Sequence, residues 1–244
     1  MKNRILTDSD RNKFKSIIDK MFDALPKEMD RKISRANVQQ AFMVDFIYPK
    51  FKDKKILCVG SFEDTAYEYL KTLGVKMVGI DPRINYDLNT YKSKTNEKFE
   101  LIFSTSVIEH VENDEQFIRD ICELLVVGGI GVLTTDFLED QPVANIVDQF
   151  LTANGIKNGI RMGREKRMEL RRLQDEQRNK ATLVIKPKED FRLYTSSDYK
   201  RITKILEKYN CFFVDEFLAD LEPDFELFPG CKYSFSTMVF RKLR

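Results

Sequence analysis

Short apolar runs alternate with amphipathic segments from residue 55 onward. The runs, each typical of a buried strand, lie at 56–60, 77–81, 101–104 and 130–135. Helix signals fill the intervals, because Asp64 and Asn113 stand where N-caps are expected and Gly128-Gly129 follows the second of these helices. Strands that alternate with helices indicate a parallel sheet of βαβ units.

The pattern differs on both sides of this region. Residues 7–48 have helical periodicity and predict an N-terminal helical extension over 1–50. A polar, basic stretch follows residue 137, and the earlier pattern resumes with a strand near 192–194, a helix over 197–209 and strands over 211–217 and 233–240. We therefore expect a seven-stranded, mostly parallel sheet with helices on both faces in a domain over 51–244, interrupted after its fifth strand by an insertion at about 138–190.

Composition narrows the class of protein. The 244 residues are 42% hydrophobic and 33% charged, which is typical of a soluble globular chain and excludes a disordered or fibrous one. Four distant cysteines form no CxxC pair, so neither a zinc site nor a disulfide framework is predicted, and a reducing cytoplasm fits best. No apolar run reaches the roughly 18 residues that span a bilayer. The net charge of +2 neither demands nor excludes a polyanionic partner.

The candidate ligand site lies at the carboxyl ends of the strands. In an open parallel sheet, ligands bind there, where the chain order reverses, and the first strand's turn is the usual contact. Gly60 permits close backbone approach, and the next helix N-terminus offers N–H groups to a carboxylate. Asp81 ends the second strand about twenty residues later, where an acidic side chain can accept both ribose hydroxyls. The alternative for Asp81 is an ordinary turn aspartate.

Several segments together resemble one enzyme family. The segments are 55–61, 78–81, 99–111 and 124–133, followed by 192–198 and 211–214. In order and spacing they resemble class I S-adenosylmethionine-dependent methyltransferases, in the small-molecule or sugar O-methyltransferase-like subgroup whose fourth strand leads into Glu109-His110-Val111. The resemblance implies a Rossmann-like fold and S-adenosylmethionine as the cofactor.

The resemblance also implies roles for individual positions. It places Gly60 and Ser61 against the methionine part of the cofactor, Asp81 on the ribose, Asp87 and Leu88 beside the adenine, and Ser106 and His110 below the sulfonium. The chain departs from the family at Cys58, where an acidic residue is usual, and at Phe62 and Asp64, where more glycines are usual. These departures keep a catalytically degenerate scaffold protein open as an alternative.

Two side chains are candidate general bases. His110 is the single histidine, and an imidazole with a pKa of about 6.5 suits proton transfer near neutrality, although it could merely shape the cofactor pocket. Asp136, just past the fifth strand, is the competing base, with a turn residue or a metal ligand as its alternatives; no metal site is predicted. By the resemblance, Arg192 and Tyr194 point toward the substrate, and their alternatives are a surface ion pair and a half-buried strand aromatic.

The insertion contributes a local charge. Residues 157–180 contain nine basic and four acidic side chains, a net charge of +5. A basic segment over the ligand edge favours a phosphorylated acceptor, while the alternative is a solvated helix without a specific role. A nucleotide-linked sugar is preferred over RNA, because no nucleic-acid module accompanies the basic residues.

The sequence thus predicts a cytoplasmic enzyme that O-methylates a small hydroxylated acceptor, such as a nucleotide-linked sugar in capsule or other cell-surface polysaccharide biosynthesis. The alternatives are an RNA or protein methyltransferase and the degenerate scaffold. Neither a membrane nor a nucleic-acid partner is expected, and self-association into a homo-oligomer stays open.

Overall fold

The structure is a computed structural model that describes residues 3–31, 34–137, 194–218, 225–228 and 231–244. The chain divides into two compact units. The first consists of Met1–Asp140, Asp190–Phe225 and Tyr233–Arg244, and the second of Gln141–Glu189 and Glu226–Lys232. The helices and the parallel strands described below belong to the first unit. The predicted insertion and its basic segment lie outside the described residues.

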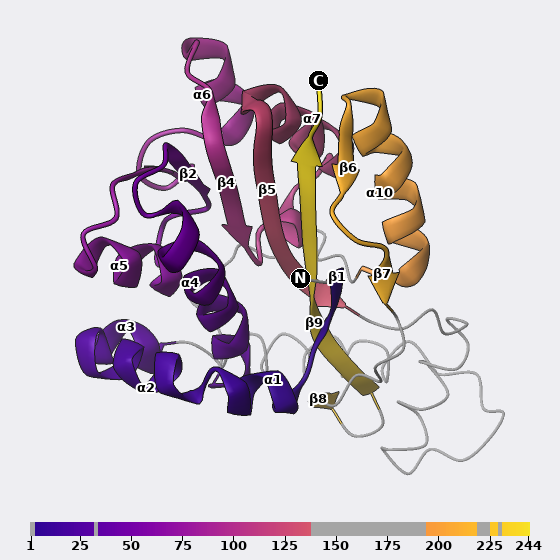
Figure 1. The fold of residues 1–244 in the computed structure, drawn as a ribbon. Helices are drawn as coiled ribbons and strands as arrows, with labels where there is room; N and C mark the ends of the chain where they lie inside the picture. Colours follow the sequence, from indigo (N-terminus) through magenta and orange to yellow (C-terminus); the bar gives the residue numbers. More distant parts are fainter. Residues whose placement is uncertain (1–2, 32–33, 138–193, 219–224, 229–230) are drawn as a thin grey trace, which may run out of the picture. The chain divides into compact units, whose positions relative to one another are not determined.

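Four parallel strands form one half of the sheet, as predicted. They are β2 (Ile56–Val59), β3 (Met77–Ile80), β4 (Phe99–Thr105) and β5 (Leu125–Phe137), and their order is β3-β2-β4-β5. Figure 1 labels β2, β4 and β5 of this set. Right-handed crossovers place α5 (Thr65–Thr72) on one face and α6 (Leu88–Lys94) and α7 (Asp114–Leu124) on the other. The chain order reverses between β2 and β4, so a ligand crevice is expected at their carboxyl ends.

The other half of the sheet is built on β9 (Cys231–Lys242), which pairs antiparallel with β5. The strands β1 (Asn3–Leu6), β6 (Cys211–Phe213) and β8 (Phe225–Phe228) pair with β9, and β7 (Phe217–Leu218) pairs with β1. The described residues therefore contain a nine-stranded sheet, and the predicted count of seven was wrong. The mostly parallel α/β architecture with helices on both faces is confirmed: it is a Rossmann-like fold.

The miscount has local causes. β1 is only four residues long and has no alternating run that would distinguish it from the helices after it. The strand predicted over 211–217 is divided because the exposed Asp215 and Glu216 separate β6 from β7. The strand predicted near 192–194 is represented in the described residues by one bridge, between Tyr194 and Phe137.

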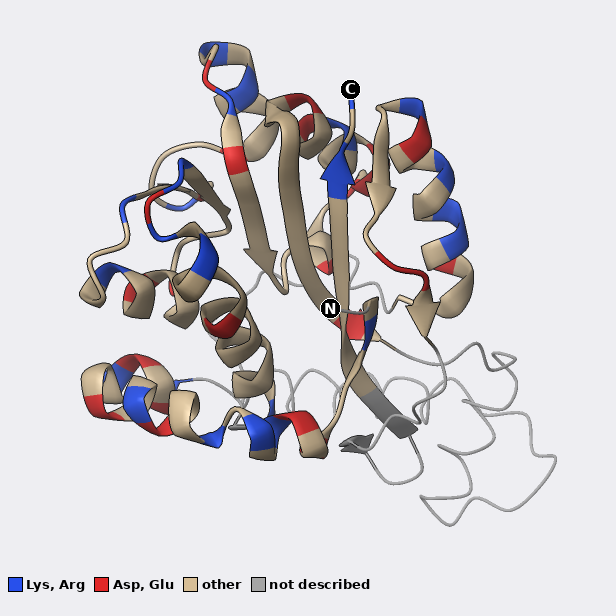
Figure 2. Ribbon diagram, viewed as in Figure 1, with Lys and Arg blue, Asp and Glu red and all other residues tan. Residues whose placement is uncertain are grey.

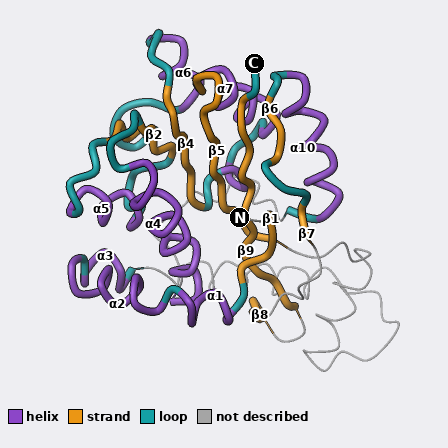
Figure 3. Tube along the Cα trace, viewed as in Figure 1, coloured by secondary structure: helices purple, strands orange, loops and turns teal. Residues whose placement is uncertain are grey.

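Helices occupy the N-terminal region, as predicted for 7–48. They are α1 (Asp8–Lys13), α2 (Lys15–Ala24), α3 (Pro26–Asp30), a 3₁₀ turn (Ser34–Ala36) and α4 (Asn37–Phe51) (Figure 3). Ten of the fifteen residues of α4 are buried, and α4 packs against α2, α5 and β4. Every residue from 37 to 44 is buried, so this part of α4 is enclosed on all sides, as in a core helix. The N-terminal region and the sheet thus share one compact unit.

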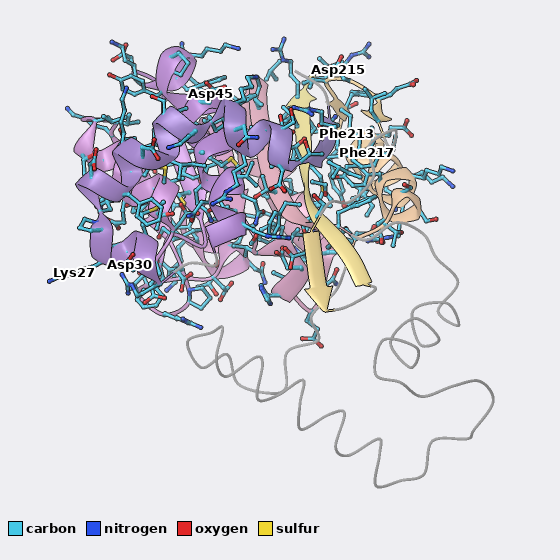
Figure 4. All side chains as sticks on the ribbon, turned by 90° about the horizontal axis from the view of Figure 1, so that it is seen from below. Lys27, Asp30, Asp45, Phe213, Asp215 and Phe217 are labelled. Atoms are coloured by element: carbon cyan, nitrogen blue, oxygen red, sulfur yellow. The ribbon has the colours of Figure 1, made fainter. Side chains whose placement is uncertain are left out.

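Aromatic packing attaches α10 (Ser196–Lys208) to the antiparallel edge. The ring centroid of Tyr199 lies 3.7 Å from that of Phe217 and 5.9 Å from that of Phe213, and Phe137 packs edge-on against Tyr199. Figure 4 labels Phe213 and Phe217 at this edge. Tyr199 and Phe137 are buried, and full burial of such a ring contributes about 1.5–3 kcal/mol to stability. A capping box between Thr195 and Asp198 begins the helix, which confirms the helix predicted over 197–209.

Candidate functional site

The turn after β2 packs between the carboxyl end of β3 and the turn after β4. Gly60 has a φ of +82°, and the N–H groups of Gly60 and Ser61 donate to the carbonyl of Ile80 at 2.8 and 3.0 Å. A Cβ atom on Gly60 would lie 2.3 Å from Cγ2 of Val107 in the turn after β4. Glycine is therefore required at this position for both its conformation and its size. The carboxyl ends of β3, β2 and β4 consequently converge on this turn.

Asp81 follows β3 directly and begins a short polar turn. Its Oδ1 accepts the N–H of Arg83 at 2.8 Å, and its own N–H donates to Oδ1 of Asn85 at 3.0 Å. This is the turn geometry that aspartate favours, so the side chain is oriented before any ligand arrives. The other carboxylate oxygen, Oδ2, does not bind the N–H of Arg83. Asp81 is thus a turn aspartate that also presents a carboxylate at the strand ends.

The thiol of Cys58 occupies the β2 position where the resembling family has an acidic side chain. Cys58 is fully buried and pairs with Gly79 of β3. Burial, followed by the charges of Asp64 and Asp81, raises the pKa of the Cys58 thiol well above its usual value. Cys58 is therefore a neutral side chain at neutral pH, and Asp64 and Asp81 are acidic groups near it.

The turn after β4 connects the sheet to α4. Ser106 has a φ of +52°, which is uncommon for a residue other than glycine, and its N–H donates to the carbonyl of Thr134 at 3.0 Å. Its hydroxyl donates to Oε1 of Gln39 at 2.9 Å. Strained backbone of this kind is concentrated at functional sites. The bond to Gln39 brings the first turn of α4 to the candidate site, a contribution that the sequence reasoning missed.

Two carboxyl groups lie near each other where β4 and β5 end: Glu109 follows β4, and Asp136 lies within β5, not past it as predicted, because β5 continues to Phe137. Glu109 is fully buried, and its Oε2 accepts the hydroxyl of Thr135 at 3.0 Å. Burial and the nearby Asp136 carboxylate raise the pKa of Glu109 well above its usual range. Burial raises the pKa of Asp136 to about 7, near the value that suits a general base at neutral pH. Sequence reasoning gave Glu109 no role, although its place in the Glu-His-Val motif had already singled it out.

His110 lies at the end of a 3₁₀ turn (Ile108–His110), directly after Glu109. It is half-buried, and its N–H donates to the carbonyl of Val107 at 2.9 Å. The turn therefore belongs to the same edge as Gly60, which contacts Val107. Both predicted bases thus lie near Glu109: His110 is the next residue in the chain, and Asp136 comes close to Glu109 from β5.

Asp87 and Leu88 begin α6. Both carboxylate oxygens of Asp87 are held by Thr90, through its N–H at 2.8 Å and its hydroxyl at 2.7 Å, and these bonds lower the pKa of Asp87. Asp87 is thus the N-cap of α6, and Leu88 is buried beneath it. This segment therefore contributes the apolar side chain of Leu88 and the first turn of α6 to the edge.

Of the two predicted substrate residues, Arg192 lies outside the described residues and Tyr194 is fully buried. The Tyr194 hydroxyl donates to Oδ2 of Asp114 at 2.8 Å, and Asp114 is also bound by Arg201 at 3.0 Å. Tyr194 is therefore part of a structural network that joins α7 to α10. It is more deeply buried than the half-buried aromatic considered from the sequence.

Several buried polar atoms at this edge have no hydrogen-bond partner. They are Oγ of Ser61, Oγ1 of Thr65, Oε1 of Glu109, Oε1 of Gln40 and both side-chain polar atoms of Asn37. Protein interiors leave few such atoms unpaired, because each costs about 1–3 kcal/mol. A polar ligand rich in donors and acceptors would satisfy them. The described residues contain no group of metal-ligating side chains and no helix long and apolar enough to cross a membrane.

Comparison with known proteins gives a local sequence match. No family model matches the chain. Over 73 residues, the chain is 36% identical to a ubiquinone biosynthesis O-methyltransferase of Rickettsia canadensis. The match covers 30% of this chain and 28% of that protein, so the chain spans less than a third of the curated relative's length.

Solved structures resemble the chain at low sequence identity and with TM-scores below 0.5. TehB from Haemophilus influenzae is 15% identical, covers 83% of this chain and 62% of its own, and has a TM-score of 0.43. PKMT2 from Rickettsia typhi, in complex with AdoHcy, is 10% identical over 83% and 52%, with a TM-score of 0.41. An O-methyltransferase family protein from Burkholderia thailandensis is 8% identical over 85% and 58%, with a TM-score of 0.43. Similarity at this level establishes no shared activity, and the Rossmann-like class rests on the chain's own topology.

Proposed function

We propose that the chain is an S-adenosylmethionine-dependent methyltransferase that methylates a hydroxyl group of a small acceptor. The observation that carries this proposal is the convergence of an oriented Asp81, the Gly60 turn and unpartnered buried polar atoms at the carboxyl ends of the strands, where the chain order reverses between β2 and β4. The local identity to an O-methyltransferase supports the same activity.

The cofactor would lie across the carboxyl ends of β3, β2 and β4. Asp81 would accept the ribose hydroxyls through the carboxylate oxygen that does not bind Arg83. The Gly60-Ser61 turn would lie against the methionine part, where the Ser61 hydroxyl lacks a partner, and Leu88 would lie beside the adenine. These residues fit a ligand that combines an apolar ring with several hydrogen-bonding groups.

For methyl transfer to a hydroxyl, the protein has to align the acceptor oxygen with the methyl group and accept one proton. Bound S-adenosylmethionine supplies an electrophilic methyl group, and the acceptor oxygen has to be held in line with it. Asp136, with a pKa of about 7, is ionised in a large fraction of molecules at neutral pH and would accept the hydroxyl proton. Glu109 would stay protonated, since burial and Asp136 both raise its pKa. His110 is the competing base.

Two classes of small molecule are the candidate methyl acceptors. A nucleotide-linked sugar is supported by the net charge of +5 over residues 157–180, because arginine pairs bidentately with phosphate. An intermediate of ubiquinone biosynthesis is supported by the name of the local relative. Both classes offer a hydroxyl as the methyl acceptor.

The test is a product-mass screen of the full chain with S-adenosylmethionine and each acceptor class. We expect one acceptor to gain a methyl group and the cofactor to become S-adenosylhomocysteine. The matched control is Asp53→Asn, which changes an exposed aspartate before β2 and should turn over like the wild type, whereas Asp136→Asn should not. Methylation of RNA or of a protein instead, with both small-molecule classes inert, would contradict the proposed acceptor.

A further inference from the structure

Two helices begin at the candidate site, and their N-termini differ in charge. The N-cap of α5 is Asp64, whose carboxylate accepts the N–H of Tyr67 at 2.7 Å, and Glu68 adds a second acidic group in the first turn. The N-cap of α4 is Ala36, which makes no side-chain cap, and the first turn of α4 contains no acidic residue. A helix N-terminus carries about half a positive charge. In α5 two carboxylates already offset that charge, and in α4 none does.

The first turn of α4 lies at the same edge as the turn after β2. Gln39 accepts the Ser106 hydroxyl at 2.9 Å, and Val107, the next residue, contacts Gly60. The guanidinium of Arg31, at the end of α3, donates to Glu63 within the turn after β2 at 2.8 Å. The bond from Ser106 to Gln39 therefore places the beginning of α4 beside the turn after β4, which contacts Gly60.

Two buried carboxamides at the beginning of α4 hold polar atoms without hydrogen-bond partners. Asn37 has no exposed surface, and neither its Oδ1 nor its Nδ2 is hydrogen-bonded. Gln40, three residues later, is 4% exposed, and its Oε1 is also unpartnered. Residues three apart lie on one side of a helix, so the two amides are neighbours. Together they offer one donor and two acceptors that the protein itself does not use.

We propose that Asn37 and Gln40, at the N-terminus of α4, bind the α-amino-carboxylate of S-adenosylmethionine. The inference rests on the proposed function and assigns a part of its cofactor site. The Asn37 Nδ2 donates to the carboxylate, while Oδ1 of Asn37 and Oε1 of Gln40 accept from the ammonium group. The positive end of α4 favours the carboxylate.

The assignment revises the expectation that α5 receives this carboxylate. The carboxylate of Asp64 already accepts the N–H of Tyr67 at the N-terminus of α5. Its charge and that of Glu68 would repel the carboxylate of a ligand. Phe62 and Asp64 stand where the resembling family has glycines, so this chain also lacks part of the usual backbone approach. The first turn of α4 provides instead a neutral, buried, polar surface.

The experiment compares two ligands that differ in the group at issue. S-adenosylhomocysteine carries the amino-carboxylate, and methylthioadenosine keeps the adenosine and the thioether but lacks it. Calorimetric titration of the full chain should show that Asn37→Leu and Gln40→Met each weaken S-adenosylhomocysteine about tenfold, as expected for a lost bond to a charged group. Both variants should bind methylthioadenosine within about twofold of the wild type. Asn12→Ala, an exposed asparagine of α1, is the matched control and should bind both ligands normally.

The outcomes separate this inference from the proposed function. Unchanged binding of both ligands by both variants would overturn the assignment to α4 while leaving the methyltransferase intact. Equal weakening of both ligands would also overturn it, because it would indicate general damage to the crevice. Failure of the wild type to bind either ligand would overturn the proposed function together with the inference. Thermal unfolding shows whether each variant folds, and the two substitutions stand as independent tests.

Discussion

The two ends of the parallel strands are built differently. At the amino end, charged side chains are paired: Lys242 donates to the carbonyls of Cys122 and Leu125 at 2.8 and 3.0 Å, and Lys92 donates to the buried Asp120 at 2.8 Å. Figure 2 shows basic and acidic residues alternating around α6 at this end. These bonds satisfy backbone carbonyls and buried charge, which is how a protein stabilises a helix end and a strand start.

At the carboxyl end, polar groups are buried and left without partners. Asn37, Ser61 and Glu109 each hold at least one such atom, and Ser106 adopts a strained backbone conformation. The cost of these features is of the order of 1–3 kcal/mol for each one. The comparison indicates that the amino end maintains the fold and that the carboxyl end is prepared for a ligand. Substitutions at the two ends should therefore affect different measurements.

The largest effect is expected at Asp136. Asp136→Asn removes the proton acceptor and should lower kcat about 10²- to 10⁴-fold, while cofactor affinity stays within about twofold. Steady-state kinetics and calorimetry on the same preparation measure the two quantities. His110→Ala is the parallel variant: if it lowers kcat more than Asp136→Asn does, His110 is the base and the assignment to Asp136 is wrong.

The next effect concerns Asp81. Asp81→Ala should weaken S-adenosylmethionine about 10- to 100-fold, because hydrogen bonds to a charged acceptor contribute about 1.5–3 kcal/mol. Glu97→Gln, at the amino end, is the matched control, since Glu97 pairs with Lys55 at the surface and should leave cofactor affinity unchanged. Equal affinity of wild type and Asp81→Ala in titration calorimetry would show that the ribose lies elsewhere.

Lys242 tests the opposite end. Lys242→Met keeps the length of the side chain but removes its bonds to Cys122 and Leu125, so the free energy of unfolding should fall by about 2 kcal/mol. Cofactor affinity at a temperature well below unfolding should stay as in the wild type. Denaturant titration and calorimetry provide the two readings. A variant of normal stability but weakened affinity would reverse the roles assigned to the two ends.

The smallest effect is a dependence of stability on pH. Burial raises the pKa of Asp136 to about 7, and the pKa of Glu109 is raised as well, so the folded state binds protons more tightly than the unfolded chain. Their contribution to stability is present below the unfolded carboxyl pKa of about 4 and is lost as pH rises through about 7. Glu109→Gln should therefore gain about 1 kcal/mol over the wild type between pH 5 and pH 8 in denaturant titrations. A constant difference across this range would show that the pair is not protonated in the folded protein.

The fold was largely predictable because its signals are local. The apolar runs of β2 to β5 stand out along the chain, and Asp64 and Asn113 cap α5 and α7 as their positions suggested. Helix α6 gave no such signal, since Leu88 is its one buried residue. The strand β1 was missed because it depends on pairing with β9, more than 200 residues away in the sequence.

The site was predictable only in part, because much of it depends on distant contacts. Gly60 and Asp81 follow strands, and their places at the edge could be read from the order of elements. The proximity of Glu109 to Asp136 and the bond between Gln39 and Ser106 join segments that no spacing rule connects. Asn37 and Gln40 look like ordinary polar positions of a helix, and their burial emerges only when α4 is enclosed by its neighbours.

One titration tests the central claim that the carboxyl end of the parallel strands binds S-adenosylmethionine. The full chain is titrated with the cofactor by calorimetry, with Asp81→Ala as the paired sample. We expect saturable one-to-one binding by the wild type and much weaker binding by the variant. Absence of binding to the folded wild-type chain at millimolar cofactor would contradict the claim.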